Sequence, residues 1–247
     1  MSSDVSERSI DEAVSAEHKR IERFYNQDFL PANAWTTLAP RAYLYLRQRQ
    51  RRIRETLLEC GFDTPEKLSQ LRVLDVGSGG GTNIAWMIEM GASPANCIGI
   101  DLLPNRVATA RARIPNVTWL QGDVTTTDVA GSFDFVMLLA VLTSVTYAPL
   151  KQKIVDRCFS LLKPGGVFFF YDVMCLREHQ TNGDYKMLMY EEMEGYLRGR
   201  KAKWYRRDLL KSSYAERWTQ RYGITWAEWL QAIGLFNMEA SFAYVRA

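Results

Sequence analysis

The chain has 247 residues, of which 47% are hydrophobic and 24% charged, and its formal net charge is +3. These values are ordinary for a globular domain, and they exclude a disordered chain, a collagen, a coiled-coil rod and a disulfide-rich miniprotein. The longest apolar stretch, residues 135–142, is far shorter than the roughly 20 residues of a membrane span, and the polar N-terminus shows no signal-peptide pattern. We therefore expect one cytoplasmic domain with no membrane partner.

Residues 1–18 are polar and weakly periodic, which predicts a flexible tail or a frayed helix. Residues 40–59 place apolar side chains on one face and precede a glycine, so a helix is expected there within a helical cap spanning 19–70. From residue 71 onward, short β-rich segments alternate with helix-like segments. Strands are predicted at 72–76, 97–101, 117–120, 133–138 and 166–173, and helices at 82–90, 104–113 and 149–162. This alternation predicts a three-layer α/β sandwich, with a parallel sheet covered by helices on both faces.

Residues 174–223 interrupt the alternation with a segment rich in tyrosine, methionine and basic residues. Segments above the carboxyl ends of strands commonly form lids, so we interpret this insert as a substrate lid. Its spaced tyrosines and methionines fit either an apolar substrate pocket or the core face of a helix. Residues 225–233 predict the last helix, and 236–247 predict two closing strands.

Lysine and arginine gather in two short runs, at 41–54 and 198–211. Each run fits a solvated helix face, a site for an anionic substrate or an RNA-binding surface that uses the neighbouring aromatic rings. The four cysteines form no CxxC pair and only two histidines are present, so buried thiols are expected and no metal site is predicted.

The most specific motif is the glycine-rich loop VLDVGSGGGT at residues 73–82, which follows a predicted strand. Glycine lets a ligand approach the backbone closely, and open α/β sheets bind ligands at the carboxyl ends of their strands. The dinucleotide fingerprint GxGxxG is incomplete because Thr82 occupies its last position. The observed pattern is DxGxGxG beginning at Asp75, and an acid there suits a ligand with an ammonium group, such as S-adenosylmethionine (SAM). A nicotinamide cofactor and a purely structural turn stay open as alternatives.

Two further carboxylates follow the next two predicted strands. Asp101 ends the second strand, where a carboxylate can accept hydrogen bonds from both hydroxyls of a ribose. Asp123 follows the third strand, and together with the N–H of Val124 it matches the hydrogen-bonding edge of adenine. A turn or helix cap is the alternative for Asp123.

Taken in order, the motifs VLDVGSGGG, GIDLLPNRV, LQGDV, FDFVMLLAVL and LLKPGGVFFFYDV resemble the class I SAM-dependent methyltransferases over residues 71–173. The resemblance implies a Rossmann-like, seven-stranded, mostly parallel sheet that ends in an antiparallel hairpin. It also implies SAM as cofactor and S-adenosylhomocysteine as product. The cofactor-binding positions that it implies are Asp75, Gly77, Gly79 and Gly81 for methionine, Asp101 for the ribose, Leu102, Asp123 and Val124 for adenine, and Leu139 after the fourth strand.

Departures from the family bear on the acceptor. Many small-molecule members carry a histidine pair after the fourth strand, where this chain has Thr143 and Ser144. The NPPY-type motif of many nucleic-acid and amide methyltransferases is absent, which argues against a nucleobase or amide nitrogen as the methyl acceptor. The segment at 24–35 is similar to the cap of members linked to glycans or secondary metabolites. We therefore expect a small-molecule hydroxyl or amine as acceptor, on an anionic or aromatic compound.

A hydroxyl acceptor needs a general base, and His179, just past the fifth strand, is the candidate. Tyr25 and Tyr171 are alternatives for positioning the acceptor, and Asp172 and Glu191 are alternative bases. RNA methylation, supported by the two basic runs, and a non-catalytic partner subunit are the rival functions. A homodimer is one assembly that the sequence leaves open.

Overall fold

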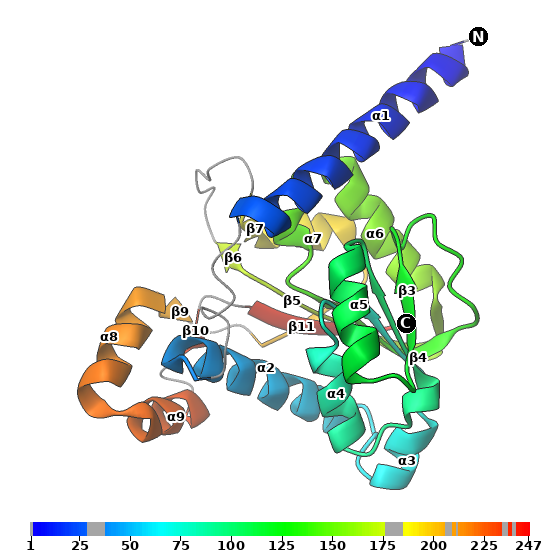
Figure 1. Ribbon diagram of the computed structural model, residues 1–247. Coiled ribbons are helices and arrows are strands. Elements are labelled where there is room, and N and C mark those ends of the chain that lie inside the picture. Colours follow the sequence, from blue (N-terminus) through cyan, green and yellow to red (C-terminus); the bar gives the residue numbers. More distant parts are fainter. Residues whose placement is uncertain are drawn as a thin grey trace.

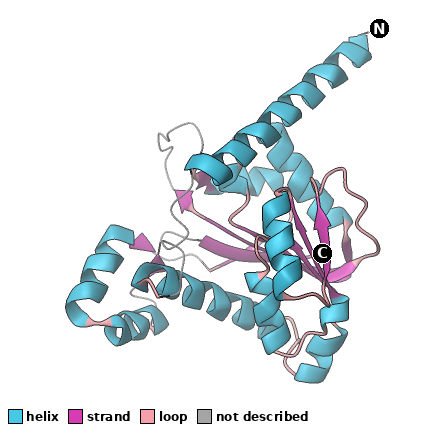
Figure 2. Ribbon diagram, in the orientation of Figure 1, coloured by secondary structure: helices cyan, strands magenta, loops and turns pink. Residues whose placement is uncertain are grey.

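A central seven-stranded sheet organises this computed structural model, which describes residues 2–28, 38–175, 185–205, 209–210, 212–233, 237–238 and 241–247. Helices cover both faces of the sheet, as Figure 2 shows. In spatial order the strands are β3 (Thr118–Gln121), β2 (Cys97–Asp101), β1 (Val73–Val76), β4 (Phe133–Leu139), β5 (Leu162–Asp172), β11 (Ser241–Arg246) and β8 (Lys203–Trp204). The predicted three-layer α/β fold is confirmed.

The first five strands are parallel, and the direction in which successive strands are added reverses between β1 and β4. Such a reversal opens a crevice at the carboxyl ends of the strands. β11 then pairs antiparallel with β5, and β8 pairs antiparallel with β11.

The edge of the sheet differs from the predicted closing hairpin, because β8 comes from the insert and not from the last residues. Trp204 of β8 packs its ring against Phe170 and Tyr190, at centroid distances of 5.2 and 5.0 Å, and this apolar contact favours the insert at the edge. The expected partner segment instead contributes β10 (Asn237–Met238), which pairs with β9 (Leu209–Leu210) in a separate small sheet. A third small sheet joins β6 (Met174–Cys175) to β7 (Leu188–Met189).

Two apolar clusters lie on opposite faces of the sheet because side chains alternate along each strand. In β4, Phe135 and Met137 point to one cluster, whereas Val136 and Leu138 point to the other. The first face carries α2 (Pro40–Glu59), α3 (Pro65–Gln70), α4 (Thr82–Glu89) and α5 (Pro104–Arg113). The second face carries α6 (Ala148–Ser160), α7 (Tyr190–Tyr196) and the end of α1 (Ser2–Arg23).

Five further helical elements extend this core. The short helices η1 (Phe24–Asp28), η3 (Pro94–Asn96) and η4 (Leu142–Ser144) follow α1, α4 and β4. The pair α8 (Ser212–Tyr222) and α9 (Ile224–Ala232) contacts α2 and stands away from the sheet (Figure 1). None of the described helices is long and apolar enough to cross a membrane.

The residues expected as a flexible tail or frayed helix belong to α1, whose N-terminal end projects from the body (Figure 1). Its other end is fixed to the start of α6 by the buried side chain of Glu17. This carboxylate accepts hydrogen bonds from the Thr146 hydroxyl at 3.0 Å, from the Thr146 and Tyr147 N–H groups, and from Arg20 at 2.9 Å. Burial raises the pKa of Glu17, but these donors outweigh it and hold the pKa below its ordinary value.

Candidate cofactor and acceptor site

A cavity that is open at its mouth lies at the carboxyl ends of β1 to β4. This is the crevice that the reversal of strand order creates. Its wall contains five of the positions that the family resemblance implies: Gly77, Asp101, Leu102, Asp123 and Val124.

The glycine loop bends tightly beside this cavity. Gly77, Gly79 and Gly81 have φ values of +71°, +54° and +79°, in the left-handed region that favours glycine. A Cβ at Gly77 would also collide with Val141, which follows β4. Glycine at position 77 therefore lets the β1 loop and the β4 loop meet at the wall of the cavity.

Asp101 joins the end of β2 to the glycine loop. Its Oδ2 accepts the Gly79 N–H at 2.8 Å, and its Oδ1 accepts the Leu103 N–H at 2.9 Å. A carboxylate has about four acceptor positions, so these two bonds orient it and leave capacity for two ribose hydroxyls. The geometry therefore fits the ribose of a nucleoside cofactor.

Four of the implied positions lie behind the wall of the cavity. Asp75 is fully buried, and its Oδ2 accepts a hydrogen bond from the Asn83 amide at 3.1 Å. Burial raises the pKa of Asp75 to about 7, against the lowering effects of Asn83 and of the Arg49 charge. Gly79, Gly81 and Leu139 are likewise absent from the lining. Their roles toward the cofactor stay predictions.

Residues after β4 occupy the wall in place of Leu139. Ala140 and Val141 both line the cavity, and Ala140 has a φ of +57°, which is unusual for a residue with a side chain. Its N–H donates to the Tyr171 carbonyl at 2.7 Å, which holds the turn in place. Strained residues of this kind cluster at functional sites.

Helix α1 and η1 cover the cavity with a face that sequence reasoning overlooked. His18, Ile21 and Tyr25 all line the cavity, and their spacing of three and four residues puts them on one helical face. That spacing was visible in the sequence, but the surrounding polar residues obscured it. The cavity therefore has a roof made by the N-terminal segment.

His18 contacts the carboxylate that was assigned to adenine. Its Nε2 lies 3.1 Å from Asp123 Oδ2, while Asp123 Oδ1 accepts the Thr125 N–H at 2.8 Å. Burial alone would raise the pKa of Asp123, but these two partners keep it below its ordinary value. Asp123 is thus an ionised acceptor directed into the cavity, as an adenine amino group requires.

At the far end of the roof, the Tyr25 hydroxyl forms a hydrogen bond with the Ser144 hydroxyl. The Arg106 guanidinium lies over the Tyr25 ring, 4.1 Å from its centroid. Burial raises the pKa of Tyr25 despite the opposing effects of Ser144 and Arg106, so the phenol is protonated at neutral pH. Two hydroxyls that donate and accept thus face one part of the cavity.

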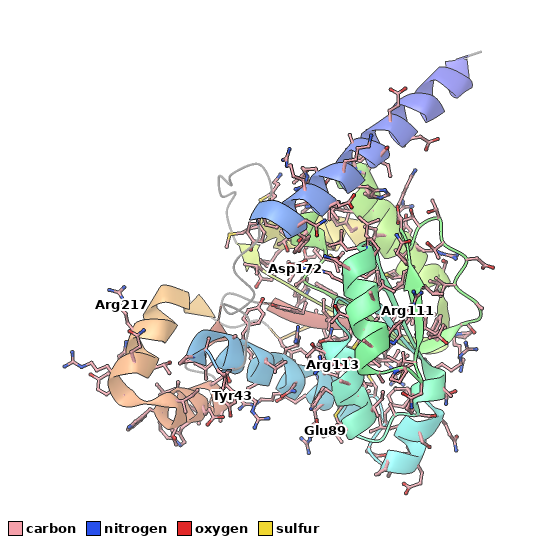
Figure 3. The ribbon with its side chains drawn as sticks, viewed as in Figure 1. Tyr43, Glu89, Arg111, Arg113, Asp172 and Arg217 are labelled. Carbon is pink, nitrogen blue, oxygen red and sulfur yellow. The ribbon has the colours of Figure 1, made fainter. Side chains whose placement is uncertain are left out.

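The other acceptor-side candidates lie outside the cavity lining. Asp172, labelled in Figure 3 at the end of β5, is buried and accepts the N–H groups of Thr143 at 3.1 Å and Val173 at 2.9 Å. Burial raises the pKa of Asp172 to about 6. Tyr171 is buried in the sheet against Tyr45, and Glu191 is exposed on α7. His179 lies outside the described residues.

The two basic runs make contacts within the chain. In the first run, Arg51 donates to the Gln231 carbonyl at 2.8 Å and Arg52 pairs with Glu55 at 2.6 Å. In the second run, Lys203 pairs with Glu59 at 2.7 Å and Arg198 pairs with Asp156 at 2.9 Å. These side chains therefore help to hold the fold together. The insert behaves similarly, because Tyr190, Met193 and Tyr196 are buried on the core face of α7.

Comparisons with known proteins agree with this geometry. A family model described as a methyltransferase domain matches residues 73–166. The arsenite methyltransferase of Rattus norvegicus is 29% identical over 205 residues, covering 73% of this chain and 55% of the relative. The ubiquinone biosynthesis O-methyltransferase of Xanthomonas axonopodis pv. citri is 39% identical over 109 residues, covering 40% of this chain and 41% of the relative. This chain therefore spans about half the length of the curated relatives it matches.

A solved structure extends the likeness to nearly the whole chain. The 1,6-didemethyltoxoflavin-N1-methyltransferase of Burkholderia thailandensis, which holds its substrate and S-adenosylhomocysteine, aligns with 96% of this chain and 88% of its own. The TM-score is 0.57 at 16% identity, which shows a shared fold. The glycine loop, the acids after β2 and β3 and the matched domain agree on SAM as the cofactor. Residues 73–166 thus match a methyltransferase domain, and the fold of the chain is that of the class I SAM-dependent methyltransferases.

Proposed function

We propose that this protein transfers the methyl group of SAM to an oxygen or nitrogen of a small organic molecule. One observation carries the proposal. A single cavity contains the Asp101 and Asp123 carboxylates at the cofactor positions and, under the same roof, the paired hydroxyls of Tyr25 and Ser144. A cofactor end and an acceptor end thus share one enclosed space.

When bound, SAM would supply a methyl group on a positively charged sulfur, and S-adenosylhomocysteine would be the leaving group. The chain supplies alignment, which is worth up to about 7–11 kcal/mol for well-placed reactants. Asp101 would hold the ribose, Asp123 and the Val124 N–H would hold adenine, and Gly77 lets the loops after β1 and β4 meet at the wall of the cavity. The roof that α1 forms would exclude water from the reacting atoms.

Tyr25 and Ser144 orient the acceptor in this proposal. The raised pKa of Tyr25 keeps its hydroxyl protonated, so it positions the acceptor by hydrogen bonding and does not remove a proton. An amine acceptor needs only desolvation and alignment. A hydroxyl acceptor needs a base, and His179 stays the predicted one. A secondary metabolite or glycan precursor stays the predicted acceptor.

The rat relative is named an arsenite methyltransferase, but the described residues of this chain give little support to arsenite as the methyl acceptor. Trivalent arsenic is a soft centre that binds thiolates, by the same preference that soft metals show. Three cysteines have described side chains, Cys60, Cys97 and Cys158, whereas the side chain of Cys175 lies outside the described part. These three are buried, none of them lines the cavity, and burial raises the pKa of Cys97 and Cys158 to about 12. These thiols stay protonated, so an oxygen or nitrogen acceptor is the better proposal.

RNA as acceptor loses its main support, because four side chains of the two basic runs are engaged within the chain. The direct test incubates the protein with methyl-labelled SAM and an extract of its source organism, followed by ultrafiltration. We expect label in the small-molecule filtrate, and none with the Asp101→Ala variant. Label that is retained and sensitive to RNase would contradict the proposed acceptor class. Failure of the unaltered protein to bind SAM in calorimetry would contradict methyl transfer itself.

A further inference from the structure

The helix pair α8–α9 exposes an unusual number of aromatic side chains. Of the seven large hydrophobic residues exposed among the described ones, five lie between residues 218 and 233. They are Trp218, Tyr222, Trp226, Trp229 and Ile233, each between 46% and 55% exposed. Exposed apolar groups scattered singly are normal, whereas a contiguous set marks a surface that meets a partner. We name these five residues the aromatic patch.

The tryptophans of this helix pair face outward. On α9, Ile224, Ala227 and Leu230 pack toward Leu44 of α2, and Gln231 donates to the Leu44 carbonyl at 3.0 Å. Trp226, Trp229 and Ile233, at spacings of three and four residues, form the opposite face. On α8, buried Thr219 lies between exposed Trp218 and Tyr222 in the sequence. The aliphatic face of α9 therefore attaches the lobe to α2, and the tryptophans stay exposed for another contact.

Two exposed arginines lie on the same helix as part of the aromatic patch. Arg217 and Arg221 of α8 are both exposed, and the Arg221 guanidinium lies 5.5 Å from the centroid of the Tyr222 ring. Arg217 projects from α8 away from α2 (Figure 3). α8 and α9 together contain two arginines and two glutamates, and α2, which they contact, contains six arginines and two glutamates. A pair of exposed cations thus lies beside the aromatic patch.

We propose that the aromatic patch docks this protein on an anionic phospholipid surface, with α8 and α9 lying in the headgroup region. Tryptophan and tyrosine favour that region because their rings are apolar and their edges polar, and arginine is attracted to anionic headgroups. Such a contact needs no membrane-spanning segment, so it departs from the expectation of no membrane partner without requiring a span. The proposal is independent of the methyl-transfer proposal.

Two other partners fit the patch less well. A second copy of this lobe would bring the exposed Arg217 and Arg221 of one copy toward the same two arginines of the other, which is unfavourable. Single-stranded nucleic acid prefers parallel ring faces on which successive bases stack. Here the Trp226 and Trp229 rings are perpendicular, with an interplanar angle of 89° at 5.4 Å, and Ile233 offers no ring.

The test compares vesicles of phosphatidylcholine alone with vesicles that also contain phosphatidylglycerol, at low and high salt. We expect the full chain to sediment with the anionic vesicles at low salt, with a blue shift of tryptophan emission. The double variant Trp226→Ser/Trp229→Ser should lose at least tenfold in vesicle affinity. Replacing Arg217 and Arg221 by glutamine should weaken binding about fivefold per arginine, since each contributes about 1 kcal/mol near such a surface.

The control variant is Leu58→Ser, because Leu58 is 40% exposed outside the patch. It should bind vesicles normally, and every variant should keep its affinity for SAM, which shows that the domain is folded. Absence of binding, or equal binding to neutral vesicles, would overturn the proposal. Self-association that the tryptophan variant abolishes, without any vesicle binding, would assign the patch to a second copy instead.

Discussion

Two backbone N–H groups orient the Asp101 carboxylate. Replacing one of its oxygens by an amide nitrogen should therefore disturb that orientation. In Asp101→Asn, the amide nitrogen would face either the Gly79 or the Leu103 N–H, donor against donor. We expect an affinity for SAM about 100-fold lower, the equivalent of one or two hydrogen bonds to a charged group. Calorimetric titration measures this, with Asp134→Asn at the amino-terminal end of β4 as control. Affinity within twofold of the unaltered protein would exclude Asp101 as the ribose ligand.

An alanine at position 77 would meet both backbone strain, from the positive φ, and a collision with a neighbouring side chain. Gly165 is a control that shows the strain without the collision. Gly165 has a similar φ of +76° but nothing within 4 Å of an added Cβ, whereas a Cβ at Gly77 meets Val141. Gly165→Ala should therefore cost only backbone strain, about 1 kcal/mol, and Gly77→Ala should cost about 1–3 kcal/mol more. Adding Val141→Ala should recover part of that difference. Equal losses in thermal unfolding would show that the two loops do not need to meet.

The buried carboxyl of Asp172 predicts a pH dependence of stability. Its pKa is raised to about 6 in the fold from 3.8, so its contribution to stability is fully present below pH 4 and is lost as the pH rises through 6. In Asp172→Asn this loss is absent. The free energy of unfolding of the variant relative to the unaltered protein should therefore rise between pH 4 and 7, by about 3 kcal/mol. Denaturant titrations at the two pH values give the difference, and a constant difference would contradict the raised pKa.

The site residues at the ends of strands could be predicted because an apolar run in the sequence indicates where each buried strand ends. Asp101 and Asp123 follow apolar runs that belong to buried strands, and the structure brings both to one cavity. His18 gave no such signal, because its partner Asp123 lies more than 100 residues away and a lone histidine in a polar segment is common. A contact between distant segments depends on how α1 docks, and no local pattern encodes that.

At the scale of elements, the attachment of α1 depends on one carboxylate. Glu17→Ala removes the acceptor for Arg20, Thr146 and Tyr147 and leaves those buried donors unpaired. We expect amide hydrogen exchange across residues 14–25 to increase and S-adenosylhomocysteine to dissociate faster, by roughly tenfold for each 1.4 kcal/mol of docking lost. Glu12→Ala, on an exposed part of the same helix, should change neither. Faster exchange without faster release would mean that α1 is not a roof for the cofactor.

Elements of the sheet were predictable to within a few residues, whereas the attached segments were less so. β1, β2 and β4 are largely buried on both faces and read as nearly continuous apolar runs, which are typical of the centre of a parallel sheet. α1 and η1 have their apolar positions on one narrow stripe, Val14, Ile21 and Tyr25, within polar sequence. β8 has only two residues, too few for any periodic pattern, and its place at the edge depends on where the Trp204 ring packs.

For the whole molecule, the topology separates two kinds of surface. The enclosed cavity lies at the carboxyl ends of the strands, under α1, whereas the aromatic patch belongs to the lobe on α2 (Figure 1). The cavity and the proposed docking surface are therefore built from different helices and strands. Variants of the patch should leave methyl transfer to a water-soluble acceptor unchanged, which an assay without vesicles would check. Loss of transfer in that assay would mean that the lobe also supports the reacting site.

The contact between His18 and Asp123 has a kinetic consequence. Asp123 Oδ2 faces the imidazole, and His18 itself lines the cavity, so the imidazole occupies space that adenine would need beside this carboxylate. Binding of SAM would then require α1 to move away from Asp123 first. In rapid-mixing experiments the observed rate of SAM binding should level off at high SAM concentration, at the rate with which the helix lets go. The rate at which α1 moves would thus set the upper limit for the rate of cofactor binding, the first step of the reaction.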